Sequence, residues 1–142
     1  MPRVSIIVPT YNRPHLLERA LCSIMQQTFR DFEVIVVNDA GCSVENHVRK
    51  FKAFSIKTIN LTANGGSSIA RNKAIECASG KYIAYLDDDD IFYPNIFRAF
   101  ILPLNQLRVI LSIRNVRMCL KMLVAKLLPR LRGFPAVSSK PH

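Results

Sequence analysis

Four short apolar runs alternate with segments of helical periodicity along the first 86 residues. Their continuous apolar character is typical of strands buried on both faces of a parallel sheet. Between them, apolar residues recur at the three- and four-residue spacing of helices. This order predicts an α/β fold, a parallel sheet with helices on both faces. The expected strands are 4–9, 32–37, 56–61 and 81–86, and the expected helices are 14–27, a second one after residue 43, and 68–78.

Capping residues support these boundaries. Pro14 suits the first turn of the first helix, where its missing N–H is no loss. Ser43 is expected to cap the second helix, because its hydroxyl can accept a hydrogen bond from a free backbone N–H. Gly80 follows the third helix and is expected to end it.

The pattern fades beyond Pro94, and the charge changes at the same point. Residues 1–94 hold 11 basic and 10 acidic residues, whereas residues 95–142 hold 9 basic residues and no acid. Residues 96–128 are rich in Leu, Ile and Val, but their basic residues do not gather on one helical face. Residues 129–142 contain three prolines and are expected to be disordered. The sequence predicts a folded unit over 1–94 and a basic, apolar tail over 95–142, partly helical and then disordered.

Several classes of site and location are disfavoured by composition. The four cysteines form no CxxC pair and the three histidines are scattered, which argues against a zinc site and a disulfide framework. Reduced thiols are typical of the cytosol. No apolar segment reaches the roughly 18 residues of a membrane span. We therefore expect a cytoplasmic protein, free or peripheral on the inner face of the membrane.

The most informative feature is the run of four aspartates, residues 87–90, directly after an apolar strand. Carboxylates in a row repel one another and lose hydration near a core, so such a cluster usually binds a cation. Their hard oxygen ligands suit Mg²⁺ or Mn²⁺. The run predicts a metal-dependent enzyme acting on a phosphorylated substrate.

Polar residues follow the other predicted strands as well. Residues 10–12 follow the first strand and residues 38–39 follow the second. Ligands of open α/β sheets bind beyond the carboxyl ends of the strands, where these groups converge with residues 87–90. Taken alone, Asp39 would be a turn residue that bonds its own backbone. The convergence favours a binding site.

Other phosphate- and metal-binding motifs are considered as alternatives. No GxGxxG follows the first strand, and Gly65 and Gly66 lack the Gly-Lys-Ser/Thr of a phosphate loop. Counted from Asp87, the sixth position of an EF-hand loop would be Phe92 rather than glycine. A receiver-like phosphoacceptor domain also gathers aspartates around Mg²⁺, although its acidic pair should follow the first strand. That domain stays an alternative.

Four motifs occur in order: VSIIVPTYNR at 4–13, FEVIVVND at 32–39, NGG followed by ARN within 64–72, and GKYIAYLDDDD at 80–90. Together they resemble family 2 glycosyltransferases of the GT-A fold. The resemblance covers about residues 3–95. It implies a Rossmann-like parallel sheet and a nucleotide-sugar-binding half-domain.

The resemblance assigns roles to the residues at the strand ends. Pro9 and Tyr11 would line the nucleotide base pocket, and Asp39 would bond uracil or an equivalent base. Arg71 would lie near the base or the diphosphate. Ala40 stands where the family often has glycine, which is expected to alter the turn without displacing Asp39.

The aspartate run matches the DxD motif of the family. Asp89 would be the leading direct ligand of Mn²⁺ or Mg²⁺, and Asp87 or Asp88 would reach the ribose, or the metal through water. Neutralising the diphosphate leaving group is the chemical reason for the metal. The resemblance implies an inverting, metal-dependent sugar transfer from a nucleotide-diphospho-sugar, with a UDP-sugar favoured. The acceptor would be a glycan or a lipid-linked glycan of polysaccharide biosynthesis.

One part of the family pattern is missing. The family uses an Asp or Glu base downstream of DxD, and this chain has no acid after Asp90. We therefore expect a truncated chain of doubtful activity alone. Residues 95–142 could instead be a basic membrane-surface segment of a non-catalytic module. A nucleic-acid-binding arm is disfavoured by the many Leu and Ile residues.

Overall fold

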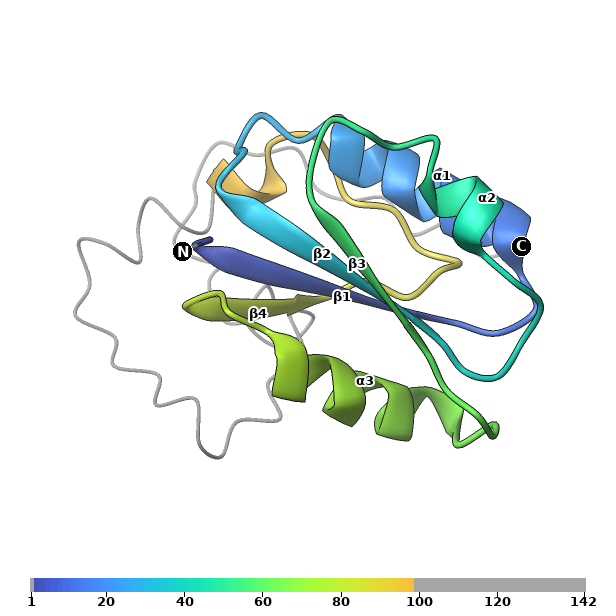
Figure 1. The fold of residues 1–142 in the computed structure, drawn as a ribbon. Helices are drawn as coiled ribbons and strands as arrows, with labels where there is room; N and C mark the ends of the chain where they lie inside the picture. Colours follow the sequence, from blue (N-terminus) through green and yellow to red (C-terminus); the bar gives the residue numbers. More distant parts are fainter. Residues whose placement is uncertain (1, 99–142) are drawn as a thin grey trace, which may run out of the picture.

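The computed structural model describes residues 2–98, which form a four-stranded parallel sheet covered by helices (Figure 1). The predicted α/β fold and its order of elements are confirmed. From residue 99 onward the predicted tail lies outside the described residues, so its helix and its disorder stay predictions. The elements are β1 (Val4–Thr10), α1 (Pro14–Met25), β2 (Phe32–Asn38), α2 (Glu45–Val48), β3 (Ile56–Asn60), α3 (Gly66–Cys77) and β4 (Tyr82–Tyr85).

The strand order is β3-β2-β1-β4, so β1 is paired on both sides. Its partner β2 runs in register from Val4↔Phe32 to Thr10↔Asn38, and every residue of β1 is buried. The chain moves outward from β1 to β3 and then crosses to the other side of β1 for β4. Because the direction of progression reverses there, the carboxyl ends of β1 and β4 border the position where open α/β sheets bind ligands.

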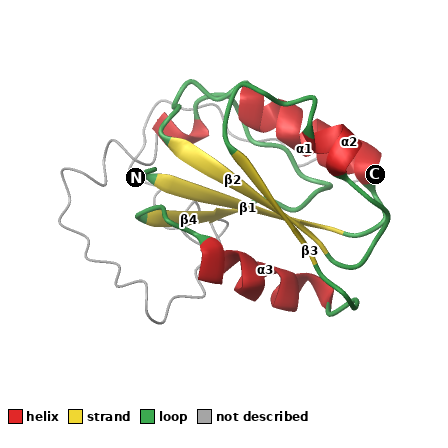
Figure 2. Ribbon diagram, in the orientation of Figure 1, coloured by secondary structure: helices red, strands yellow, loops and turns green. Residues whose placement is uncertain are grey.

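Helices cover both faces of the sheet, as predicted (Figure 2). On one face α1 turns Leu17, Leu21 and Ile24 into a core with alternate residues of β1 and β2. On the other face α3 contributes Ala70 and Ala74. These short side chains leave room for the helix backbone to lie close to the sheet, which positions the amino end of α3 beside the strand ends.

Three local expectations were wrong. The second helix is a single turn whose N-cap is Val44, without a side-chain hydrogen bond, so Ser43 does not cap it. The third helix begins two residues early, at Gly66. Gly80 does not end it through a left-handed conformation, since Gly66 is the glycine with positive φ among the described residues. A Cβ on Gly80 would instead lie 2.5 Å from the backbone nitrogen of Ser5, so glycine is needed for close approach.

Glu33 joins three segments at the opposite, amino end of the strands. Its Oε1 accepts hydrogen bonds from Ser5 Oγ at 2.5 Å and from the backbone nitrogen and hydroxyl of Ser79 at 2.7 and 2.8 Å. Burial alone would raise the pKa of Glu33, but these bonds and one from the Gly80 backbone outweigh it and lower the pKa. The ionised carboxylate therefore stabilises the contact of β1, β2 and the segment before β4.

This lowered pKa makes stability depend on pH. Since the folded-state pKa lies below the ordinary value of 4.5, the stabilisation is present above that pH and is lost as pH falls through the folded-state value. We expect the Glu33→Gln variant to unfold more easily than wild type at neutral pH and the difference to shrink in acid. Urea denaturation across pH measures this, with Glu76→Gln as an exposed control. A difference that stays constant with pH would contradict the assignment.

Candidate functional site

The candidate site lies at the carboxyl ends of β1, β2 and β4, where the structure places the three predicted polar groups. Thr10 is level with Asn38 on one side. On the other side Ile7 pairs with Tyr85, so the same register carried three residues further brings Thr10 level with Asp88. Sheet pairing thus brings together residues far apart in the sequence.

Residues 87–90, here called the acidic turn, form a compact loop after β4. The backbone nitrogen of Asp90 donates to the carbonyl of Asp87 at 3.0 Å. Carboxylate oxygens of Asp87, Asp89 and Asp90 all lie within 4.8 Å of one another. Three oxygen donors at this spacing suit a hard divalent cation. The ligand prediction named Asp87 and Asp89 but left out Asp90.

Asp88 differs from its neighbours because it is fully buried. Its Oδ2 accepts a hydrogen bond from Thr10 Oγ1 at 2.8 Å. Its Oδ1 lies 2.7 Å from Arg13 Nη2 in an ion pair that lacks hydrogen-bond alignment. Burial raises the pKa of Asp88, opposed by Thr10 and Arg13. The residue predicted to reach the ribose, or the metal through water, therefore faces the protein interior.

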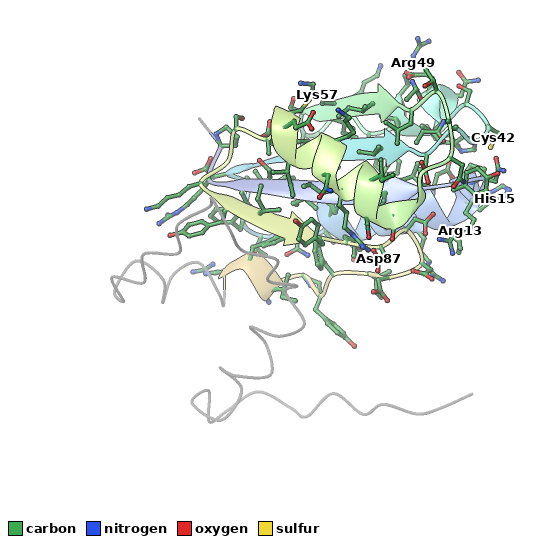
Figure 3. The ribbon with its side chains drawn as sticks, turned by 90° about the horizontal axis from the view of Figure 1, so that it is seen from below. Arg13, His15, Cys42, Arg49, Lys57 and Asp87 are labelled. Atoms are coloured by element: carbon green, nitrogen blue, oxygen red, sulfur yellow. The ribbon has the colours of Figure 1, made fainter. Side chains whose placement is uncertain are left out.

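Arginines from both helical layers neutralise the acidic turn. Arg13 Nη1 lies 3.6 Å from a carboxylate oxygen of Asp89, and Arg19 donates to the Asp89 carbonyl at 2.5 Å. Arg71, on α3, pairs with Asp87. Figure 3 shows Arg13 and Asp87 on the same side of the molecule. Sequence reasoning missed Arg13 and Arg19; the acidic run indicated a counter-charge but not its source.

Arg71 is held from two further sides. Its Nη1 donates to Ser67 Oγ at 3.3 Å, one turn earlier on α3. Its guanidinium lies 5.8 Å from the centre of the Tyr85 ring. These contacts hold a positive charge at the rim of the acidic turn. The predicted contact of Arg71 with a base or diphosphate stays a prediction.

Asp39 is more than a turn residue. Its carboxylate is almost fully buried and accepts hydrogen bonds from the backbone nitrogens of Gly65 at 2.8 Å and Gly66 at 2.7 Å. Gly66 has φ +81°, a conformation that favours glycine. Asp39 therefore ties the end of β2 to the start of α3. A carboxylate oxygen has two lone pairs, so each can still accept from a ligand.

Two loops beside Asp39 adopt left-handed backbone conformations. Asn12 has φ 53° and Ala40 has φ 59°. Asn12 Oδ1 accepts from the Cys42 nitrogen at 2.8 Å, and Asn38 Oδ1 accepts from the Gly41 nitrogen at 3.0 Å. The expectation that Ala40 leaves Asp39 in place agrees with this geometry, although alanine adopts positive φ at a cost.

Pro9 and Tyr11, the other predicted base contacts, differ in exposure. Pro9 is buried in β1 opposite Val37. Tyr11 is 44% exposed, directly after the strand. Tyr11 follows Thr10, whose carbonyl accepts a hydrogen bond from the Asp39 backbone nitrogen at 2.9 Å, and an exposed aromatic ring here can stack against a planar ligand. Their assigned roles stay predictions.

Comparison with known proteins agrees with this arrangement. The model of the glycosyl transferase family 2 matches residues 5–130. The chain belongs to glycosyl transferase family 2. The match extends beyond residue 95, where the recognisable sequence motifs end. Membership in family 2 also leaves the receiver alternative without support.

A curated relative is similar in sequence to about two thirds of this family 2 chain. The Escherichia coli enzyme UDP-Glc:alpha-D-GlcNAc-diphosphoundecaprenol beta-1,3-glucosyltransferase WfgD is 40% identical over 95 residues. The match covers 65% of this chain and 37% of that protein. The chain likewise spans only 28% and 34% of two other curated relatives.

Solved structures match the fold as well. S. aureus TarS in complex with UDP-GlcNAc is 29% identical with a TM-score of 0.70, covering 73% of this chain and 31% of that one. The mannosyltransferase PcManGT from Pyrobaculum calidifontis, in complex with GDP-Man and Mn²⁺, is 29% identical with a TM-score of 0.64. It covers 71% of this chain and 31% of that one. The predicted GT-A type of α/β fold is confirmed.

None of the helices within residues 2–98 could span a lipid bilayer.

The contact between Asp39 and α3 leads to a measurable prediction. In the Asp39→Asn variant an amide group replaces one acceptor oxygen, so one glycine N–H loses its partner. We expect a loss of about 1–3 kcal/mol in the free energy of unfolding. Amide hydrogen exchange at Gly65 or Gly66, followed by NMR, should become faster, whereas Asp31→Asn should change neither quantity. Unchanged exchange at both glycines would contradict the proposed tie.

Proposed function

We propose that this chain is the donor-binding part of a glycosyltransferase, which binds a nucleotide-diphospho-sugar with a divalent cation at the acidic turn. The observation that carries the proposal is the cluster of the Asp87, Asp89 and Asp90 carboxylates within 4.8 Å, at the strand ends of a family 2 chain. The UDP-GlcNAc complex of TarS, a relative in fold and sequence, supports the class of ligand.

The acidic turn fits a metal by its donor set. Asp89 and Asp87 are the proposed ligands, and Asp90 can supply a third oxygen. Such oxygen donors suit Mn²⁺ or Mg²⁺, and the relative PcManGT is described with Mn²⁺ and GDP-Man. When bound, the ion would supply neutralisation of the diphosphate leaving group.

The base would bind at the ends of β1 and β2. Tyr11 offers an exposed ring for stacking, with Pro9 buried behind it in the strand. Asp39 is already fixed by Gly65 and Gly66 and keeps free lone pairs. An N–H of uracil could donate to them, which favours a UDP-sugar as the donor.

The diphosphate would lie between the acidic turn and α3. Arg71 carries the positive charge on that side and can exchange its partner Asp87 for a phosphate oxygen. Asp87, more exposed than Asp88, is then the better candidate for the ribose contact. Asp88 would need to break its bonds with Thr10 and Arg13 to make that contact.

The transfer step itself requires a base that the residues after Asp90 do not contain. An inverting transfer proceeds when a carboxylate removes the proton of the acceptor hydroxyl. We assign that role to no residue. Donor binding is therefore the function that the residues of this chain support, and sugar transfer by the chain alone is expected to be poor.

The acceptor and location are proposed from the relatives and from charge. WfgD is named for a diphosphoundecaprenol-linked substrate, so a lipid-linked glycan is the proposed acceptor. Residues 95–142 carry nine basic residues and no acid, which suits a peripheral position on an anionic cytoplasmic membrane surface.

Calorimetric titration of the full chain with UDP tests the proposal. We expect binding that requires Mn²⁺ or Mg²⁺. The Asp89→Ala variant should bind at least about tenfold more weakly, because a direct metal ligand is lost. Asp31→Ala removes an exposed acid elsewhere and should bind like wild type. Metal-independent binding, or equal binding by Asp89→Ala, would refute the site assignment.

A further inference from the structure

Asp88 is not among the proposed metal ligands. Its buried carboxylate nevertheless contacts both the Thr10 hydroxyl and the Arg13 guanidinium. We propose that Thr10, Asp88 and Arg13 form a positioning triad, which holds the neighbouring carboxylates in the arrangement that binds the metal. This inference rests on the proposed function, since it concerns the same metal site. It assigns no metal contact to the triad itself.

The carboxylates of the acidic turn differ in the direction that they face. The Asp88 side chain is 1% exposed, whereas that of Asp87 is 43% exposed and that of Asp89 is 56% exposed. The hydrogen bond from the Asp90 nitrogen to the Asp87 carbonyl closes a tight turn around Asp88 and Asp89. With Asp88 fixed inward in this turn, the carboxylates of Asp87 and Asp89 stay on the solvent side, where Asp90 joins them.

Burying Asp88 has an energetic cost. A buried carboxylate is unfavourable unless it is paired and hydrogen-bonded, and three neighbouring carboxylates add repulsion. The hydroxyl of Thr10 and the guanidinium of Arg13 are the contacts that offset this cost. Without either contact, Asp88 would be driven outward into the space of the ligand carboxylates.

Arg13 reaches two carboxylates of the acidic turn. Nη2 lies 2.7 Å from Asp88 Oδ1, and Nη1 lies 3.6 Å from Asp89 Oδ2. One rigid, planar guanidinium thus relates the buried carboxylate to the leading metal ligand. Lysine keeps the charge but offers a single ammonium group, which cannot hold both carboxylates in this geometry.

The simpler alternative is that Arg13 only neutralises the acidic turn and that Thr10 only stabilises the fold. Two variants that conserve charge separate these explanations. Thr10→Val removes the hydroxyl at almost constant shape, and Arg13→Lys removes the planar fork. Neither variant changes the net charge near the turn. A loss of metal affinity would therefore result from a changed arrangement of the carboxylates, not from a change in electrostatic attraction.

The experiment titrates the full chain with Mn²⁺, alone and with UDP, and follows free Mn²⁺ by electron paramagnetic resonance. We expect both variants to bind Mn²⁺ about tenfold more weakly or worse, as when other supporting partners of metal ligands are removed. Thr10→Ser, which keeps the hydroxyl, should restore affinity. Thr58→Val on β3 and Arg49→Lys after α2 are the matched controls; Figure 3 shows Arg49 well apart from Arg13 and Asp87.

Thermal unfolding without metal accompanies each titration, so that loss of fold is recognised. Arg13 is half-exposed, so Arg13→Lys should fold even if Thr10→Val does not. Wild-type affinity in folded Thr10→Val and Arg13→Lys proteins would overturn the positioning triad and leave the proposed function intact. Absence of Mn²⁺ binding by wild type, both alone and with UDP present, would overturn the proposed function, and this inference with it.

Discussion

The hydrogen-bonded register of β1 against its two neighbours determines the geometry of the whole candidate site. Pairing with β2 places Thr10 beside Asn38, and pairing with β4 as far as Ile7↔Tyr85 brings Thr10 within hydrogen-bond distance of Asp88. A slip of one residue on either side would exchange the side chains that face the two helical layers and separate these groups. Since the core faces of β1 are fully buried, burial of apolar side chains fixes the register and, through it, the position of polar residues at the strand ends.

The charges of the site depend on both helical layers. Four carboxylates at the end of a core strand would repel one another. The arginines that neutralise them come from opposite faces of the sheet. Arg13 and Arg19 belong to the start and the first half of α1, while Arg71 belongs to α3. The turn after β4 supplies the carboxylates, and the two helical layers supply the arginines. Packing of the layers and neutralisation of the acidic turn are therefore one structural requirement.

Much of this fold could be predicted from sequence because its signals are local. Continuous apolar runs indicate buried parallel strands, and acids after such a run indicate a site at the strand ends. The inward turn of Asp88 could not be predicted, because it depends on a contact with Thr10, which lies 78 positions away in the chain. The same holds for Asp39, whose partners Gly65 and Gly66 lie in another loop, and for Gly80, which is required by contact with Ser5.

The arrangement also explains why a nucleotide and a cation would suit this site together. Arg71 and Arg13 offset part of the charge of the acidic turn. A divalent cation alone would approach carboxylates that are paired with arginines, and would meet the repulsion of those arginines. A diphosphate alone would be repelled by the negative charge of the carboxylates. When both arrive, the phosphate oxygens can take Arg71 while the cation takes the carboxylate that Arg71 leaves, so every charge keeps an opposite partner. A site of this composition therefore favours the pair over either ion alone.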